Sequence, residues 1–309
     1  MNDSVRISVV IAIDNAEARL RQAIRSALTS DINELEVIVV DNGALDRCAD
    51  AISREHDSRI VRVRLRPGHG VTRSRNVGIA RARAPYVTFL EPNDRLRPDR
   101  LSAAVNALDR HSDAGFAFAN FECVSEAGET IRPSGMGCFP GFTSVATEPL
   151  EGNWRLIRQP DLARGLLYEN FIGTSGVVVR RQLFTEIGPF AEEAACCANL
   201  DLWFRLAHRC DALYTSDISH SQWEGVGDGG KKDSAGEECN AVLRREKTRW
   251  NDRTARRLID RRIAQNLAEV ACQERRRRHR LRSSLMFAYA FATSPDIRWL
   301  RGMLSTVLY

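Results

Sequence analysis

Two short polar stretches carry the side chains with the clearest capacity for chemistry in this sequence. Each directly follows an apolar run: "DNGALD" spans 41–46 and "EPND" spans 91–94. Carboxylate and amide oxygens grouped in this way suit a hard divalent cation or the polar edges of a nucleotide. The simpler interpretation of the second stretch is a polar turn, in which Asn93 or Asp94 bonds the backbone of the next segment.

The elements that must position these stretches alternate between strand and helix. Strands are predicted at 6–13, 35–40, 60–65, 86–90 and 115–120. Helices are predicted at 16–30, near 46–56, at 71–83 and at 98–111. Nearly continuous apolar strands separated by amphipathic helices indicate an α/β fold, with a parallel sheet covered on both faces. Ligands bind outside the carboxyl ends of such strands, so both polar stretches are predicted edges of a site.

The rest of the chain divides into a loop-rich middle and a helical end. Residues 121–165 suggest long loops, and 171–190 resume a strand and a helix. A helix is predicted at 199–210, a lid-type loop at 225–238, and Arg-rich helix from about 238 to 282. The tail predicts two short apolar helices divided at Ser294-Pro295. We therefore predict a domain at 1–237 and a basic, helical appendage at 238–309.

Composition and charge limit the classes of protein that fit. The net charge is +5, yet residues 244–282 alone carry fifteen Lys or Arg against five Asp or Glu. Three interpretations of this segment stay open: a solvated helical face, contact with an anionic membrane surface through 275–309, or nucleic-acid binding. Nucleic acid ranks last, because aromatic side chains are not interleaved with the arginines. The first βα turn, "AIDNAEA", has no glycine, which disfavours a G-x-G-x-x-G dinucleotide fold.

The cysteines and the N-terminal stretch predict a cytoplasmic protein. Eight cysteines are scattered without a C-x-x-C pair, which argues against a structural zinc site or a disulfide framework. The adjacent Cys196 and Cys197 leave a redox role open. The start reads as a strand and not as a signal peptide, and no apolar run reaches the length of a membrane-spanning helix.

Five stretches, in order, give the chain a resemblance to family 2 glycosyltransferases with the GT-A fold, from Arg6 to Glu224. They are "ISVVIAIDNAEARLRQAIRSAL", "LEVIVVDNGALD", "GHGVTRSRNVGIARARAPYVTFLEPNDRL", "GTSGVVVRRQLFTEIGPF" and "NLDLWFRLA". The resemblance implies a Rossmann-like, mostly parallel sheet with helices on both faces. It also implies transfer of a sugar from a nucleotide-diphosphate sugar to a glycan or lipid-linked acceptor, with inversion.

The donor side of this resemblance falls on the ends of the predicted strands. The family's "DDGS" turn corresponds to Asp41, Asn42, Gly43 and Ala44, and Asp14 stands where an aromatic residue is usual. Arg73 and Arg75 match the basic segment near the diphosphate, although a solvated helix face is an equal alternative. The resemblance assigns nucleotide-sugar binding to Ala12, Asp14, Asp41, Asn42, Gly43, Arg73, Arg75, Glu91 and Asn93.

The resemblance also implies a metal and a general base. The family's Asp-x-Asp-Asp appears here as 91–94, with Asp94 as the direct ligand of Mg²⁺ or Mn²⁺ and with Glu91 and His220 as further ligands. A cation there neutralises the leaving diphosphate. The base position of the family's "ED" pair falls on Asn199, which cannot accept a proton as aspartate does.

Because Asn199 cannot act as the base, other residues have to be considered for that role. Asp201 and Glu193, the latter beside Glu192, are the alternative candidates for the base, and Gly173, Thr174, Ser175 and Trp223 are the candidates for the acceptor side. The competing hypothesis is a degenerate GT-A domain that binds a nucleotide or glycan, or acts as a scaffold, without turnover.

Overall fold

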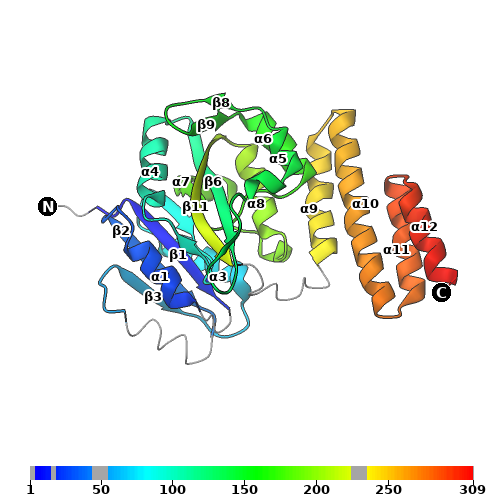
Figure 1. Cartoon of the computed structure of the whole chain (residues 1–309), viewed down its shortest axis with the longest axis horizontal. Helices are drawn as coiled ribbons and strands as arrows, with labels where there is room; N and C mark the ends of the chain where they lie inside the picture. The colour runs from blue at the N-terminus through cyan, green and yellow to red at the C-terminus, as the bar shows by residue number, and fades with distance from the viewer. Residues whose placement is uncertain (1–3, 15–18, 44–54, 224–234, 309) are drawn as a thin grey trace.

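The fold is built on one mixed β-sheet, with helices on both faces and a stack of helices at one end (Figure 1). The computed structural model describes residues 4–14, 19–43, 55–223 and 235–308. Four parallel strands form the N-terminal half of the sheet. In spatial order they are β3 (Ile60–Arg64), β2 (Leu35–Asp41), β1 (Ile7–Ile13) and β4 (Tyr86–Phe89).

The second half of the sheet mixes parallel and antiparallel pairs. β10 (Val178–Arg180) lies antiparallel between β4 and β6 (Ala114–Val124), and β6 pairs in parallel with β11 (Asp211–Trp223). The short strands at its margins are β9 (Trp154–Ile157), β8 (Glu148–Pro149), β5 (Arg95–Leu96) and β7 (Thr130–Arg132).

Alternation along the strands divides the core into two layers. In β1 all seven residues are buried; Val9 and Ile11 face one layer while Val10 faces the other. The first layer is covered by α1 (Leu20–Leu28) and α4 (Arg100–Arg110). The second is covered by α3 (Gly70–Arg81), α6 (Gln159–Tyr168), α7 (Gln182–Ile187) and α8 (Ala198–Ala207). The predicted α/β sheet with helices on both faces is therefore confirmed.

The C-terminal helices stand side by side at one end of the molecule (Figure 1). They are α9 (Ala235–Arg249), α10 (Arg253–Arg276), α11 (Arg280–Thr293) and α12 (Ile297–Leu308). Val242 of α9 and Ile259 of α10 belong to the main core, whereas Ala268 and Phe287 belong to a small separate cluster. The division between the two hydrophobic clusters therefore falls in the middle of α10 and not at the predicted boundary of 237/238. Helix α9 and the first half of α10 pack on the sheet domain, whereas the second half of α10 packs with α11 and α12.

Several predictions about the middle of the chain need correction. Residues 121–165, predicted as long loops, contain β7, β8 and β9 together with η1 (Met136–Cys138), α5 (Pro140–Thr143) and the start of α6. Their apolar runs are too short for a periodic signal. The scattered cysteines argued against disulfides, yet Cys197 and Cys239 are joined, with Cα atoms 5.3 Å apart. Most of the helix predicted near 46–56 and of the loop at 225–238 lies outside the described residues.

Candidate active site

A polar cavity of about 390 Å³ opens at the carboxyl end of β4. It gathers eight of the residues predicted from the sequence, although they come from segments far apart in the chain. They are Arg75, Glu91, Asp94, Gly173, Thr174, Ser175, Asn199 and His220. The parallel strand β4 ends at Phe89, and the segment after residue 172 is held beside it by a bridge between Phe89 and Ser175.

Arg75 is the centre of the hydrogen bonds on one wall of the cavity. Its guanidinium is largely buried and lies over the ring of Phe190. It pairs with the Glu91 carboxylate and donates a hydrogen bond to Asn199 Oδ1 at 3.1 Å. Asn199 in turn donates from Nδ2 to Thr174 Oγ1 at 2.5 Å. The amide at the expected position of the general base therefore bridges a cation and a hydroxyl group.

Asp94 also lines the cavity and is almost completely buried. Ser175 Oγ donates to Asp94 Oδ2 at 2.5 Å and accepts the Glu91 backbone N–H at 3.0 Å. Burial raises the pKa of the Asp94 carboxyl to about 7; the Ser175 hydrogen bond opposes this rise, and the nearby Glu91 charge adds to it. The carboxyl group is thus held close to its protonation midpoint at neutral pH.

His220 of β11 presents one defined ring nitrogen to the cavity. Ser219 Oγ donates its proton to the Asn120 carbonyl at 2.9 Å, so in its 2.7 Å contact with His220 Nδ1 it accepts. His220 is then protonated at Nδ1, and its Nε2 lone pair lies 3.9 Å from Asp94 Oδ2. Burial, together with the charge of Arg100, lowers the pKa of His220 to about 3, which keeps the ring neutral.

The predicted nucleotide turn lies at the ends of the neighbouring strands β1 and β2. Asn42 donates to Asp14 Oδ1 at 2.6 Å and accepts the His69 backbone N–H at 3.1 Å, while Asp41 Oδ1 accepts the Gly43 N–H at 3.0 Å. Gly43 has a φ of +84° and leaves no room for a Cβ beside Pro67. These contacts fix the turn.

Several predicted site residues do not reach the cavity. Asp201 receives hydrogen bonds from Arg205 and Arg245 on the far side of α8, as expected for a residue two positions along a helix from Asn199. Glu193 is exposed on η2 (Glu192–Ala194). Neither of these carboxylates lines the cavity, so the structure does not support either as the base.

Four further residues that were predicted for the site also lie outside the cavity lining. Trp223 lies under Arg19, 4.9 Å from its guanidinium carbon, because strand alternation turns it away from the side of Gln222. Asn93 is not among the lining residues. Arg73 is half exposed, with Glu192 4.0 Å away, and the Ala12 side chain is buried within β1.

Six lining residues were not predicted: Phe121, Phe139, Asn170, Phe171, Ile172 and Gln222. The sequence could have predicted Gln222 as a lining residue, because it is two positions from His220 on one strand and therefore shares its face. Phe121 stacks on His220 with ring centroids 5.5 Å apart. No pattern in the sequence could have predicted this contact, since only the pairing of β6 with β11 brings the two rings together.

The residues present fit a divalent cation in part. Asp94 and His220 offer a carboxylate oxygen and a fixed imidazole lone pair, whereas the Glu91 carboxylate is occupied by Arg75. In the part of the chain that the structure describes, no group of three or more His, Cys, Asp or Glu side chains is placed to hold a metal. A cation here would need oxygens from the donor diphosphate to complete its coordination.

The sequence of the chain is similar to those of known glycosyltransferases. Residues 8–188, more than half of the chain, match the family described as Glycosyl transferase family 2. Succinoglycan biosynthesis protein ExoO of Rhizobium meliloti is 31% identical over 126 residues, covering 41% of this chain and 36% of the relative. An uncharacterized glycosyltransferase of Haemophilus influenzae is 30% identical over 122 residues, covering 38% of this chain and 49% of the relative. The matched parts thus span less than half of these relatives.

Solved structures extend the comparison to the fold. S. aureus TarS 1–349 in complex with UDP-GlcNAc superimposes with a TM-score of 0.64 at 16% identity, covering 97% of this chain and 89% of that chain. This likeness confirms the GT-A fold with its C-terminal helices. Together with the match over residues 8–188, it shows that the chain belongs to glycosyltransferase family 2.

Proposed function

We propose that the chain transfers a sugar, with inversion, from a nucleotide-diphosphate sugar to a hydroxyl group of a glycan or glycoconjugate. The observation that carries this proposal is the cavity shared by Arg75, Asp94 and His220 at the carboxyl end of β4. The charge of a leaving diphosphate has to be stabilised as it forms: the Arg75 guanidinium supplies positive charge directly, and the Asp94 carboxylate and the His220 lone pair would do so by holding a divalent cation. Membership of family 2 supports the same class of reaction.

A uridine diphosphate sugar is the donor to test first. TarS has been solved with UDP-GlcNAc, and E. coli WfaP, 24% identical over 115 residues, is named as a UDP-Glc glucosyltransferase. In this chain the turn of Asp14, Asp41 and Asn42 lies at the ends of β1 and β2, where carboxylate and amide oxygens can accept from a base N–H or a ribose hydroxyl. Asp14 offers no aromatic face for the base, so polar contacts would dominate.

Arg75, Asp94 and His220 would serve the diphosphate. Arg75 brings a cation that no change of pH in the physiological range removes. Asp94 and His220 would hold Mg²⁺ or Mn²⁺, which supplies positive charge at the leaving group when bound. Because Asp94 has a pKa of about 7, its hold on a cation strengthens as the pH rises through neutrality.

The acceptor side raises the second candidate function. Asn199 lines the cavity where a carboxylate base is expected, and its amide is held between Arg75 and Thr174. An amide cannot take the acceptor proton, so turnover would be slow or would depend on another group. This observation favours, as the alternative, a domain that binds the donor or a glycan without transferring the sugar.

Polysaccharide biosynthesis in the cytoplasm is the setting we propose, following the name of ExoO. Within the described residues, no helix is both long and apolar enough to cross a membrane. Leu281, Leu285 and Tyr289 follow one another along α11 and are 85%, 59% and 62% exposed. This apolar face, next to the Arg-rich end of α10, would suit peripheral contact with an anionic membrane.

Calorimetry tests the proposal. UDP and UDP-GlcNAc are titrated into the chain with and without Mn²⁺, and sugar release is then followed by chromatography. We expect binding that Mn²⁺ strengthens and that Asp94→Ala weakens at least tenfold. Asp113→Ala, which removes an exposed carboxylate elsewhere, is the control. Failure to bind any nucleotide would sink the donor site, and binding without sugar release would favour the alternative.

A further inference from the structure

Two further cavities lie in a row beside the transfer cavity, over the C-terminal helices, and their lining mixes apolar with amide and charged side chains. A second cavity of about 320 Å³ shares Asn170 and Asn199 with the transfer cavity. A third, of about 800 Å³, shares Arg262, Asn266 and Glu269 with the second. The shared lining residues place the three cavities next to one another, in order from the transfer site to α12, and together we call them the groove.

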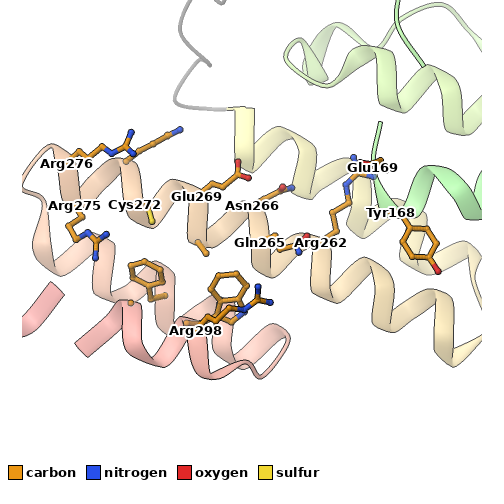
Figure 2. A pocket seen from close by; sticks show the side chains of 15 residues that line it. Tyr168, Glu169, Arg262, Gln265, Asn266, Glu269, Cys272, Arg275, Arg276 and Arg298 are labelled. Atoms are coloured by element: carbon orange, nitrogen blue, oxygen red, sulfur yellow. The ribbon is translucent and has the colours of Figure 1, made fainter. Parts of the chain in front are cut away.

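One face of α10 forms the floor of this groove. Residues 262, 266, 269, 273 and 276 recur at intervals of three and four, so they share a helix face, and all of them line the third cavity. At 1.5 Å per residue the stripe is about 21 Å long. Figure 2 shows Arg262, Asn266, Glu269 and Arg276 following one another along α10, with Arg298 across the groove from them. A groove of this length accommodates several sugar rings.

The lining has the chemistry of a carbohydrate site. Amide side chains, such as those of Asn170, Gln265 and Asn266, can both donate to and accept from sugar hydroxyl groups. Tyr168, 46% exposed, and Trp299 offer aromatic faces on which a sugar ring can lie. Tyr168 is the more available of the two, because Trp299 also packs against the cluster of Ala268 and Phe287 and lies under Arg298.

The charged side chains that line the third cavity favour the binding of an anionic ligand. Four arginines line the third cavity, at 262, 275, 276 and 298, against two glutamates, at 169 and 269. Asp296 already pairs with Arg298 at 2.7 Å, so the net excess of positive charge is small and rests on Arg275 and Arg276. Across the described part of the chain, no carboxylate lies within ion-pairing distance of Arg262 or Arg276. Arg262 is the more constrained of the two: it donates to the Leu166 carbonyl at the junction of the second and third cavities. The nearby charge of Glu169 acts on Arg262, whereas Arg276 is exposed, so Arg276 is the guanidinium that is more available to an anionic ligand.

We propose that this groove binds an extended anionic glycan, the acceptor chain whose end reaches the transfer cavity. The inference rests on the proposed transferase function, since it assigns the acceptor of that same site. Carboxylate groups of uronic acids and phosphate groups between sugars share the charge that the arginines require, so either class fits.

The groove can be tested by titration with oligomers of defined charge. Oligogalacturonides provide carboxylates, glycerol-phosphate oligomers provide phosphates, and malto-oligosaccharides of equal length are neutral. Tryptophan fluorescence reports binding, and its loss in Trp299→Phe assigns the change to the ring in the groove rather than to the other four tryptophans. We expect one anionic series to bind more tightly as its length increases, and more weakly as salt is added. The neutral series should bind at least about threefold more weakly.

Matched variants assign the binding to the groove. Arg276→Gln should weaken the anionic oligomer about threefold to tenfold, whereas Arg257→Gln, on α10 but outside the groove, should not. Tyr168→Ala should weaken both the anionic and the neutral oligomers, and the exposed Tyr289→Ala of α11 should change neither. Circular dichroism of each variant checks that the fold is retained.

Three results would overturn the proposal: no binding of any oligomer, equal effects of the Arg276 and Arg257 variants, or displacement of a bound oligomer by anionic phosphatidylglycerol vesicles. The last result would mean that a membrane surface occupies the groove. The UDP titration keeps the two proposals apart. A chain that binds UDP but no oligomer loses only the groove, and a chain that binds oligomers but no UDP loses only the donor site.

Discussion

At the scale of single residues, Asn199 decides what the cavity can do. It lies between Arg75 and Thr174, so the geometry around the base position is intact while the basic group is missing. A carboxylate at this position would meet a guanidinium already 3.1 Å away, which favours its charged form. The position is therefore prepared for aspartate without further rearrangement.

Asn199→Asp should raise the rate of sugar transfer by about tenfold or more, because a positioned general base contributes at least this much in many enzymes. UDP affinity should fall by about twofold to tenfold, because the new carboxylate pairs with Arg75, which the diphosphate also uses. Initial rates with UDP-GlcNAc and a mixed-glycan acceptor measure the effect, and Asn199→Ala is the matched variant without a base. A variant no faster than the parent chain would mean that another group removes the acceptor proton.

Asp94 should make stability depend on pH. Its folded pKa of about 7 lies above the unfolded value of 3.8, so the folded state binds more protons between these limits. The stabilisation from this group is present at low pH and is lost as the pH rises through 7. Asp94→Asn removes the charge while its side-chain oxygen can still accept from Ser175.

Asp94→Asn should therefore raise the free energy of unfolding at pH 8, by on the order of 2–4 kcal/mol, and change it little at pH 4. Urea unfolding at both values gives the comparison. Asp113→Asn, a change at an exposed position, is expected to have the same small effect at each. An equal effect of Asp94→Asn at both pH values would contradict the raised pKa.

At the scale of elements, the disulfide joins two helices that shape the site. Cys197 precedes α8, which carries Asn199, and Cys239 lies in α9, 42 residues further on. Both cysteines also line the second cavity. A change in this bond would thus be felt both in stability and in the wall of the groove.

Reduction of Cys197–Cys239 should lower the free energy of unfolding by about 2–4 kcal/mol, because a cross-link over this separation restricts the unfolded chain. Denaturant unfolding with and without reductant measures the loss. Cys197→Ser/Cys239→Ser should show no response to reductant, whereas Cys272→Ser should respond as the parent chain does. If the double variant still responds, the bond that matters lies elsewhere.

The elements also show what a sequence can reveal of this site. The strands β1, β2 and β4 were predicted because nearly every residue in them is apolar, and the position of Asp94 followed from the end of β4. Asn199, Thr174 and Ser175 were located by motifs, and the cavity contains all three. The packing of Phe121 on His220, by contrast, depends on a pairing of β6 with β11 that no local pattern encodes.

At the scale of the whole molecule, the distal helices present an apolar face. If α11 contacts a membrane, Leu285→Ser should reduce sedimentation with phosphatidylglycerol vesicles by about threefold or more, because a leucine that is 59% exposed loses its burial in the lipid boundary. Ile131→Ser, at an apolar residue of β7 that is 52% exposed and lies outside the C-terminal helices, should have no effect. Neutral phosphatidylcholine vesicles should bind both proteins more weakly, since the arginines then have no anionic surface to meet.

The cavity joins partners that are far apart in the sequence. Arg75 meets Asn199 across 124 positions, and Asp94 meets Ser175 across 81. Contacts of such separation form only when the parallel half of the sheet and the mixed half have been assembled together. A partly folded species can therefore show native-like helix content by circular dichroism while it has no nucleotide affinity. If the chain binds UDP as proposed, the stoichiometry of binding is a stricter measure of intact molecules than any spectrum of the backbone, because it gives the fraction of a preparation that has completed folding.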